Sequence, residues 1–531
     1  MKFKKFEGNP VLGSKELGTC FDVYVTRENG LYRMDFSWRP KKSLAVTFSR
    51  DGIHWDTPQI TLAPDETTGW EDRLNRNCVL KIGDTYQMWY TGQARGFSFI
   101  GYAESKDGIH FERVLKEPVL ISERAWEGFS VMNPCVLYEE GVYRMWYAAG
   151  ETYEPNVLAY AESRDGIHWE KPSLGLVEFE GSRDNNILMM YAHGTGVMLD
   201  EQELDPAKRY KLMTRVDYPG VPGFMAVSFS PDGIHWQELT RWPNHNPQAD
   251  SHNFVFRDHT DGKFKLITRI WKNGMRVSAM CESSDFINWS EPVEVLRGRG
   301  YENQVYSMPV FRCGKLFLGL VSVFHEGDMD AENFDCVDLE LTLATNVKTF
   351  DFVAPDDPLI PRGAGRYPTG AYDCGCIYAA VPVEVDGTTY IYYMGGNGQH
   401  TNFRETSFCR ASFQKDKWAY LGLKDKSRTA QVMTSQFHFY GTYFDLLAEL
   451  ENEDDLQIGL FDHYRDDQPM EGYGFEDARI EKTEDGYYRI RFAKPLLDLD
   501  RKNPSIVIRL KGDSKLFALR GDLTIATGRY N

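Results

Sequence analysis

The stretch SRDGIHW at residues 49–55 decides the fold, because it returns along the chain at nearly constant spacing. Its copies are SKDGIHF (105–111), SRDGIHW (163–169), SPDGIHW (230–236) and SSDFINW (283–289), which begin 56, 58, 67 and 53 residues apart. Weaker copies are NVKTFDF (346–352) and FQKDKW (413–418). An Asp-Gly pair is typical of a tight turn that closes a hairpin, and we expect the following Trp or Phe to pack on the next sheet.

The same strand pattern precedes each turn. In the third copy, the apolar strand CVLYEEG is followed by YRMWYAAG and then by LAYAESRDG. Four short strands in about 60 residues are the content of one β-propeller blade. The sequence therefore predicts an all-β chain whose residues 1–425 form a β-propeller catalytic domain. Seven repeats can be counted, which predicts seven blades, with five as the alternative.

The repeat ends after LGLKDKSRTAQ (421–431). Residues 432–531 still alternate apolar and polar positions, as in YYRIRFAKPL and SIVIRLKG, with turn residues between the runs. This pattern predicts a separate antiparallel β-sandwich as an accessory domain.

The composition excludes several classes of partner. Asp and Glu number 78 against 60 Lys and Arg, so that the net charge of -18 argues against nucleic acid or an anionic membrane. No apolar stretch approaches 18 residues and no apolar run follows the basic N-terminus, which predicts a soluble, cytoplasmic protein. Among nine scattered cysteines, Cys374-Gly-Cys376 has no second pair at ligand spacing, so we expect neither a metal nor a cofactor. The C-terminal domain is the candidate surface for a homo-oligomer.

The candidate site follows from the propeller geometry, since the inner strands of a propeller all begin around one face of its channel. Aligning the repeats on Tyr143 places Asp22, Arg76, Asn133 and Ser307 at one equivalent position. Other polar and aromatic residues precede the inner strands: Trp70-Glu71, Trp126-Glu127, Tyr301-Glu302, Tyr372-Asp373, His193, Asp250 and His252. Aromatic rings, carboxylates and amides around one pocket are typical of a sugar site.

A structural interpretation competes for most of these residues. Glu71 and Glu127 recur at one repeat position and could instead fix a turn, while Trp70 and Trp126 could pack between blades. His193 and His252 are more often hydrogen-bonded loop residues than catalysts. Asp22 differs, because it is the only acid at its aligned position.

At these residues the chain resembles a known group. CFDVYVTRENGLYRMDFS (20–37), EGNPVLG (7–13), KEPVL (116–120) and the S-x-D-G-x-x-W turns are similar to the propeller glycosidases of glycoside hydrolase families 32 and 43. The resemblance implies Asp22 as nucleophile or general base, and a propeller followed by a sandwich resembles family 32. Those families have five blades, and their second catalytic Asp is replaced here by Asn133.

The leading hypothesis is a glycoside hydrolase that acts on a short oligosaccharide or glycoside. Asp22 would be the nucleophile or base, and Glu302, or else Glu127, the general acid with a pKa raised by neighbouring carboxylates and burial. The remaining candidates would bind substrate: Trp70, Glu71, Arg76, Trp126, Asn133, His193, Asp250, His252, Tyr301 and Asp373. Carboxyl groups about 5–5.5 Å apart would predict retention of configuration, and about 6.5–9.5 Å inversion.

Two alternatives remain open. A polysaccharide lyase would use His193, His252, Tyr301 and Arg76 to abstract a proton beside a uronate carboxylate, although the acidic surroundings would repel a uronate. A non-catalytic carbohydrate-binding propeller would be favoured if Asp22 were paired to an arginine and shielded from the channel.

Overall fold

A computed structural model describes residues 3–13, 17–150, 156–249, 253–462, 468–499 and 502–526. The chain divides into two compact units, one of residues 2–382 with 391–411 and the other of residues 383–390 with the chain from 412 onward. Regular structure is almost entirely β-strand. Within the described ranges, no helix has the length and apolar character needed to cross a membrane.

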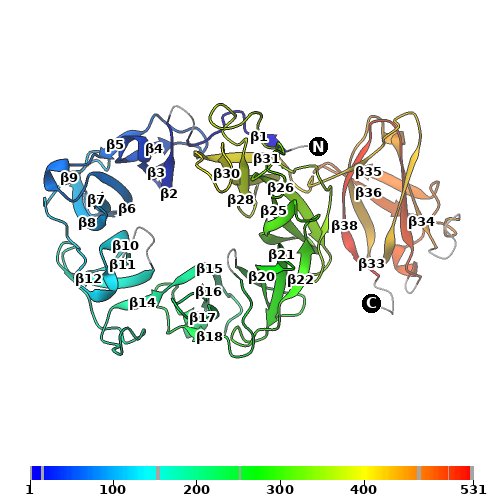
Figure 1. Cartoon of the computed structure of the whole chain (residues 1–531). Coiled ribbons are helices and arrows are strands. Elements are labelled where there is room, and N and C mark those ends of the chain that lie inside the picture. The colour runs from blue at the N-terminus through cyan, green and yellow to red at the C-terminus, as the bar shows by residue number, and fades with distance from the viewer. Residues whose placement is uncertain are drawn as a thin grey trace. The chain divides into compact units, whose positions relative to one another are not determined.

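The first unit is a β-propeller, in which short antiparallel sheets follow one another around a common centre (Figure 1). Seven repeats of this kind occur in the described chain, and we number them 1 to 7. The strands of repeats 1 to 4 are β2 (Cys20–Glu28), β3 (Leu31–Trp38), β4 (Ser43–Ser49) and β5 (Gln59–Leu62); β6 (Arg73–Ile82), β7 (Thr85–Ala94), β8 (Phe97–Ser105) and β9 (Glu112–Arg113); β10 (Ser130–Glu139), β11 (Val142–Gly150), β12 (Val157–Ser163) and β13 (Trp169–Glu170), with β14 (Ile187–Met190) beside β12; and β15 (Ala192–Leu199), β16 (Tyr210–Val216), β17 (Phe224–Ser230) and β18 (Thr240–Arg241).

Repeats 5 to 7 follow the same order of pairing. Their strands are β19 (Phe254–Arg257), β20 (Phe264–Lys272), β21 (Met275–Ser283) and β22 (Val293–Arg297); β23 (Asn303–Ser307) with β24 (Val310–Cys313), β25 (Leu316–His325), β26 (Val337–Ala344) and β27 (Asp351–Phe352); and β28 (Cys376–Ala379) with β29 (Val383–Val385), β30 (Thr388–Gly396) and β31 (Thr406–Gln414). The predicted propeller class is thus confirmed, while the number of blades stays a prediction.

The N-terminal strand β1 (Lys4–Lys5) pairs with β31 and so completes the sheet of repeat 7. The Lys5 ammonium also forms an ion pair with the buried Asp373 carboxylate at 2.6 Å. The two ends of the repeat array therefore meet in one sheet, which leaves fewer unpaired strand edges than an open array would.

The turn motif after the third strand holds its shape through its own side chains. In repeat 3, the Ser163 hydroxyl accepts a hydrogen bond from the Gly166 N–H at 2.9 Å, and Gly166 has φ 78°. The Asp165 carboxylate accepts from the backbone N–H groups of Ile167 and His168 and contacts the His168 ring at 2.7 Å. Because glycine adopts positive φ without steric cost, the Asp-Gly pair is what lets the turn close. The predicted turn is present.

These turns also join neighbouring repeats. The Trp89 indole of repeat 2 donates to the Gly166 carbonyl of repeat 3 at 2.8 Å, and its ring meets Trp169 edge-on. Likewise, the Arg33 guanidinium of repeat 1 donates to the Gly108 carbonyl of repeat 2 at 2.6 Å. Trp169, the aromatic residue of the third motif, therefore packs on the preceding repeat and not on the next one.

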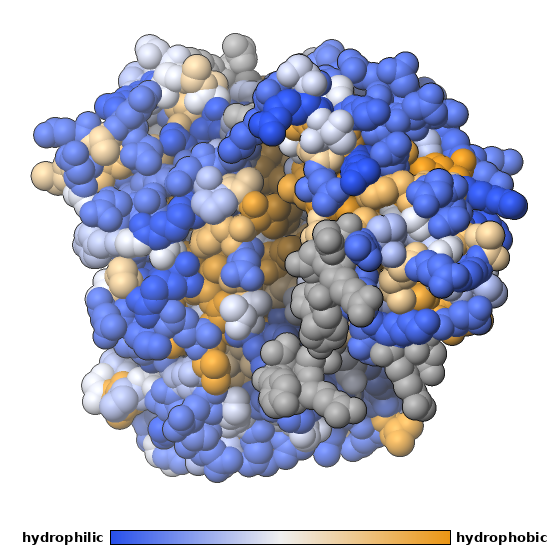
Figure 2. All heavy atoms as spheres, turned by 90° about the vertical axis from the view of Figure 1, so that its right-hand side faces the viewer, coloured by the Kyte–Doolittle hydropathy of each residue, from blue (hydrophilic) through white to orange (hydrophobic). Residues whose placement is uncertain are grey.

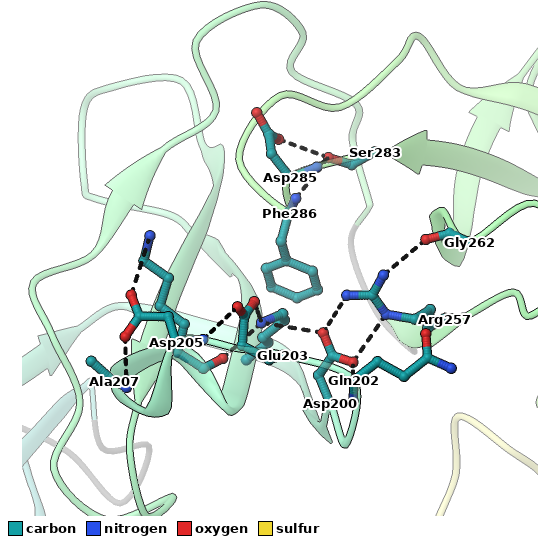
Figure 3. Close-up of polar contacts among 12 residues, drawn as sticks. Asp200, Gln202, Glu203, Asp205, Ala207, Arg257, Gly262, Ser283, Asp285 and Phe286 are labelled. Atoms are coloured by element: carbon teal, nitrogen blue, oxygen red, sulfur yellow. Dashed lines mark hydrogen bonds and ion pairs between the residues drawn. The ribbon is translucent and has the colours of Figure 1, made fainter.

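The fifth copy of the motif replaces the glycine by Phe286, which keeps the left-handed backbone at φ 67° and is fully buried. Ser283 and Asp285 make the usual turn contacts beside it (Figure 3). The Phe286 ring contacts Phe229, Phe264 and Trp289. Aromatic packing therefore offsets the steric cost of about 1–2 kcal/mol that a side chain meets in this backbone region.

The second unit consists of antiparallel strands around one apolar core. Its strands are β32 (Leu421–Gly422), β33 (Ala430–Glu449), β34 (Leu456–Phe461), β35 (Ala478–Lys482), β36 (Tyr487–Phe492), β37 (Ser505–Leu510) and β38 (Lys515–Ile525). The 20-residue strand β33 pairs with β37 through its first part and with β36 and β38 through its second part. Phe444, Leu446 and Ile490 are among the fully buried residues of this core.

On the face that Figure 2 draws, hydrophilic residues make up most of the outer surface, in keeping with the net charge of -18.

The backbone of Phe286 leads to a stability prediction. We expect Phe286→Gly to be about 1 kcal/mol more stable than Phe286→Ala, because both lose the ring but only glycine also removes the left-handed strain. Both variants should be less stable than the wild type by a few kcal/mol, since a buried phenylalanine is lost. Urea-unfolding midpoints measure the difference. As a matched control, the buried Phe264 in strand β20 should show the usual order, with Ala more stable than Gly; the same order at both positions would contradict the strain argument.

Candidate functional site

The first strands of repeats 1 to 3 carry a bulge at the same place. The pairing register shifts between Phe21 and Tyr24, between Asn75 and Asn77, and between Met132 and Cys135. The residues within these shifts include Asp22 (φ 53°), Arg76 (φ 52°) and Asn133 (φ 58°). Non-glycine residues at positive φ are strained, and such strain concentrates at functional sites.

Asp22, Arg76 and Asn133 thus lie at one equivalent position, as the alignment of the repeats predicts, whereas Ser307 does not. In repeat 6 the pairing register shifts at Tyr306, whereas Ser307 lies opposite Ser322. The alignment misses Tyr306 because eleven positions separate it from Phe317, whereas ten separate Arg76 from Tyr86 and Asn133 from Tyr143. Hydrophobic spacing gives no signal for where along the strand the register shifts.

The bulges of repeats 2 and 3 are each bonded to a hydroxyl group of the preceding repeat. The fully buried Ser37 accepts a hydrogen bond from the Arg76 backbone N–H at 2.9 Å, and the fully buried Thr91 accepts one from the Asn133 N–H at 3.0 Å. These bonds satisfy N–H groups that the bulges remove from strand pairing. Asp22, Arg76 and Asn133 are therefore held in register from one repeat to the next.

The Asp22 carboxylate is oriented by two groups. The Ser37 hydroxyl donates to its Oδ2 at 3.1 Å, and the Arg76 Nε lies 3.4 Å from its Oδ1. The Asp22 side chain nevertheless keeps 27% of its surface exposed, and Arg76 keeps 34%. Asp22 is thus paired to an arginine but remains open, so that the shielded geometry expected of a purely structural pair is not present.

The carboxylates of Glu71 and Glu127 are fully buried, unlike Asp22. Glu71 accepts hydrogen bonds from the Tyr90 hydroxyl at 3.0 Å and the Arg113 guanidinium at 2.7 Å. Glu127 accepts from the Tyr147 hydroxyl at 2.6 Å and forms an ion pair with Lys171 at 2.8 Å. It also accepts from two backbone N–H groups of its own loop.

Asp373 repeats this arrangement in repeat 7. Its carboxylate contacts the Lys5 ammonium and accepts from the Tyr393 hydroxyl at 3.2 Å. We name the sets Glu71–Tyr90–Arg113, Glu127–Tyr147–Lys171 and Asp373–Tyr393–Lys5 the buried clamps. In each clamp an acid before the first strand meets a tyrosine of the central strand and a cation at the outer edge of the same repeat. This geometry supports the structural interpretation of Glu71, Glu127 and Asp373.

The accompanying tryptophans also pack within the protein. Trp70 is 6% exposed, stacks on Tyr90 and donates its indole N–H to the Lys116 carbonyl at 2.9 Å. Trp126 donates to the Asn186 side chain at 3.0 Å and meets Phe179 edge-on. These contacts give both rings a packing role.

The third pair, Tyr301 and Glu302, is different. Glu302 is exposed, and its carboxylate makes no hydrogen bond or ion pair within the described residues. Tyr301 is 48% exposed. Of the three Glu residues in the aligned pairs, Glu302 is the one that is open to solvent.

The remaining candidates are placed as follows. The His193 ring lies 3.3 Å from the Asp217 carboxylate, which also accepts hydrogen bonds from Arg215. Asp250 and His252 lie outside the described residues.

Tyr306 and Tyr378, on the first strands of repeats 6 and 7, belong to an aromatic cluster that the sequence does not single out. The rings of Tyr306, Phe324 and Tyr378 surround His400, whose Nδ1 contacts the Tyr378 hydroxyl. Burial, followed by the nearby Arg404, lowers the pKa of His400, so that the ring is neutral near pH 7. A search of the described residues finds no group of three or more His, Cys, Asp or Glu that could hold a metal ion.

Comparisons with known proteins agree with the sequence-based resemblance. Residues 25–192 match the family model described as the glycosyl hydrolases family 32 N-terminal domain. The predicted resemblance to this group is thus confirmed over these residues, which are less than half of the chain.

Two curated relatives match shorter segments. An uncharacterized protein of Mycobacterium tuberculosis strain H37Rv is 31% identical over 183 residues, covering 32% of this chain and 58% of that protein. A 1,2-beta-oligomannan phosphorylase of Thermoanaerobacter sp. strain X514 is 33% identical over 110 residues, covering 20% of this chain and 36% of that enzyme. Among solved structures, a thermostable family-43 glycoside hydrolase aligns over 54% of this chain and 98% of its own, with 14% identity and a TM-score of 0.30.

The buried clamps lead to a prediction that separates the aligned glutamates. Glu127→Gln should destabilise the protein by about 3–5 kcal/mol, because the 4% exposed Lys171 would lose its buried carboxylate partner and keep only the exposed Glu123 carboxylate at 3.6 Å. Glu302→Gln should change the stability by less than about 0.5 kcal/mol, because an exposed side chain without contacts is lost. Denaturant unfolding of the two variants measures this. Equal stability of both would contradict the structural role of the clamp.

Proposed function

We propose that this protein cleaves glycosidic bonds at the end of the propeller where the first strands begin, with Asp22 as the nucleophile or general base. The observation that carries the proposal is the position of Asp22, at a strained bulge with its carboxylate oriented and still exposed. A carboxylate held in this way costs little reorganisation when it attacks or accepts a proton. The family 32 match over residues 25–192 supports the same reaction class.

Glu302 is the proposed general acid. It precedes the first strand of repeat 6, and its free, exposed carboxyl group is able to meet a leaving-group oxygen. Glu127 is withdrawn from this role, because its carboxylate is fully buried and already bonded to Tyr147 and Lys171. Arg76 and Asn133, which share the bulge position with Asp22, are proposed to bind substrate hydroxyl groups.

Substitution of Asp22 tests the proposal. Asp22→Asn should lower kcat/KM by about 10²-fold or more, because an amide is neither a base nor a nucleophile. Release of nitrophenol from a panel of nitrophenyl glycosides and of reducing ends from β-linked disaccharides measures it. Asp84→Asn, which changes an exposed acid in the turn between β6 and β7, is the matched control and should keep full activity.

The contrary outcomes are specific. Wild-type activity in folded Asp22→Asn would refute the role of Asp22. Sugar binding without turnover by the wild type would favour the binding alternative, and an absorbance rise from unsaturated products on uronate polymers would favour the lyase.

Phosphorolysis is a second candidate, in which phosphate replaces water as the attacking group. It is favoured by the Arg76 guanidinium beside Asp22 and by the 110-residue likeness to a 1,2-beta-oligomannan phosphorylase. Arginine binds phosphate well because its planar fork matches two phosphate oxygens.

Dependence on inorganic phosphate separates the two candidates. The substrate is β-1,2-mannobiose, assayed with and without 10 mM phosphate. Cleavage that is about tenfold faster with phosphate and yields mannose 1-phosphate would show phosphorolysis. We expect Arg76→Gln to lose this response to phosphate. Equal rates with and without phosphate, yielding only free mannose, would leave hydrolysis as the function. High-performance anion-exchange chromatography resolves both products.

A further inference from the structure

A cavity of about 700 Å³ lies within the propeller unit between three loops of repeats 6 and 7. The loops comprise residues 326–336 between β25 and β26, residues 353–375 between β27 and β28, and residues 397–405 between β30 and β31. His325, at the end of β25, is paired with Asn303, at the start of β23, so these loops lie at the end where the first strands begin. The cavity is outside residues 25–192, which match family 32.

The loops are tied to one another by hydrogen bonds. The Gln399 side chain donates to the Phe334 carbonyl at 3.2 Å, and the Thr401 N–H donates to the Asp335 carboxylate at 3.2 Å. Arg362 donates to Asp338 at 2.7 Å and to the Cys374 carbonyl at 2.8 Å. A cavity built from loops that are already fixed binds a ligand with a smaller ordering cost.

Close backbone approach also shapes the cavity. A Cβ atom at Gly375 would come within 1.9 Å of the Gly398 carbonyl oxygen, so that the loop before β28 and the loop after β30 can meet there only with glycine. The two loops therefore form a fixed wall.

The charges on the lining residues balance. Two acids, Glu332 and Asp338, stand against two arginines, Arg362 and Arg366. The Asp338 carboxylate is further bonded to His325 at 2.7 Å. In a chain with a net charge of -18, a concave surface without net charge favours a neutral ligand.

The polar and aromatic groups of the lining favour a sugar. The rings of Tyr367 and Phe403 meet edge-on, with their centroids 5.7 Å apart. These residues keep 43% and 61% of their surface exposed, respectively. The Asn333 side chain lines the cavity and makes no hydrogen bond within the described residues. Exposed rings pack on the apolar faces of sugars, while free amide groups bind hydroxyl pairs.

We propose that this cavity is a carbohydrate-binding site for a neutral oligosaccharide, with Tyr367 and Phe403 as its stacking rings and Asn333 as a hydroxyl-binding residue. Asp22 and its partners do not line it. The proposal rests on the proposed function and deepens it, because a second set of sugar contacts makes an oligosaccharide the substrate rather than a glycoside of one sugar.

Binding to a turnover-deficient protein tests the site. An array of neutral and uronate-containing oligosaccharides of two to five sugars is probed with Asp22→Asn, and the best neutral ligand is then titrated calorimetrically. Adding Tyr367→Ala and Phe403→Ala to the Asp22→Asn protein should weaken the affinity for this ligand at least tenfold. Tyr440→Ala, at a 57% exposed tyrosine of the other unit, is the matched control and should leave the affinity unchanged. If the double variant does not fold, Asn333→Ala replaces it, with at least threefold weaker binding expected.

The outcomes separate this proposal from the proposed function. Binding that depends on Tyr367 and Phe403 supports the cavity even if no substrate is cleaved. Unchanged affinity in folded variants, binding of uronates alone, or no neutral ligand at millimolar concentration would overturn it, whatever the fate of Asp22→Asn.

Discussion

The buried clamps join the strands of repeats 2, 3 and 7 through a carboxylate that has almost no contact with solvent. A carboxylate without solvent contact is costly to bury unless cations and hydrogen-bond donors replace the lost water. In repeats 2 and 3, Glu71 and Glu127 meet this condition with a tyrosine and a cation each. In these two repeats the acid precedes the first strand and the cation follows the third, so each of the two clamps joins the start and the end of one repeat.

The turn motif made the propeller predictable. Asp-Gly pairs, aromatic residues and strand spacing are local signals, and the contacts around Asp165 and Gly166 are as local as the sequence suggested. Phe286 shows the limit of such signals, since its backbone keeps the glycine conformation while Phe229, Phe264 and Trp289 pack around its ring. Tertiary packing of that kind cannot be read from the motif.

The candidate site was predicted only in part. Asp22, Arg76 and Asn133 share one position in the structure, as the alignment indicated, but the bulge that strains them gives no sequence signal. The burial of Glu71 and Glu127, in contrast, has a signal in the sequence. Arg113 and Lys171 both stand two residues after the aromatic residue of their turn motif, and no other copy among the five clear ones has a cation there. Pairing these cations with the preceding glutamates would have distinguished both acids from Glu302.

The pairing of β1 with β31 sets an order of events for folding. Lys5 and Asp373 are 368 residues apart, and β31 ends at Gln414, so that repeat 7 has no complete sheet until more than 400 residues have been made. At roughly 5 to 20 residues per second, synthesis of that length takes on the order of 20 to 80 seconds. The N-terminal strand therefore waits without its partner while the other repeats emerge, and the closing sheet is the last part of the propeller that a ribosome can deliver.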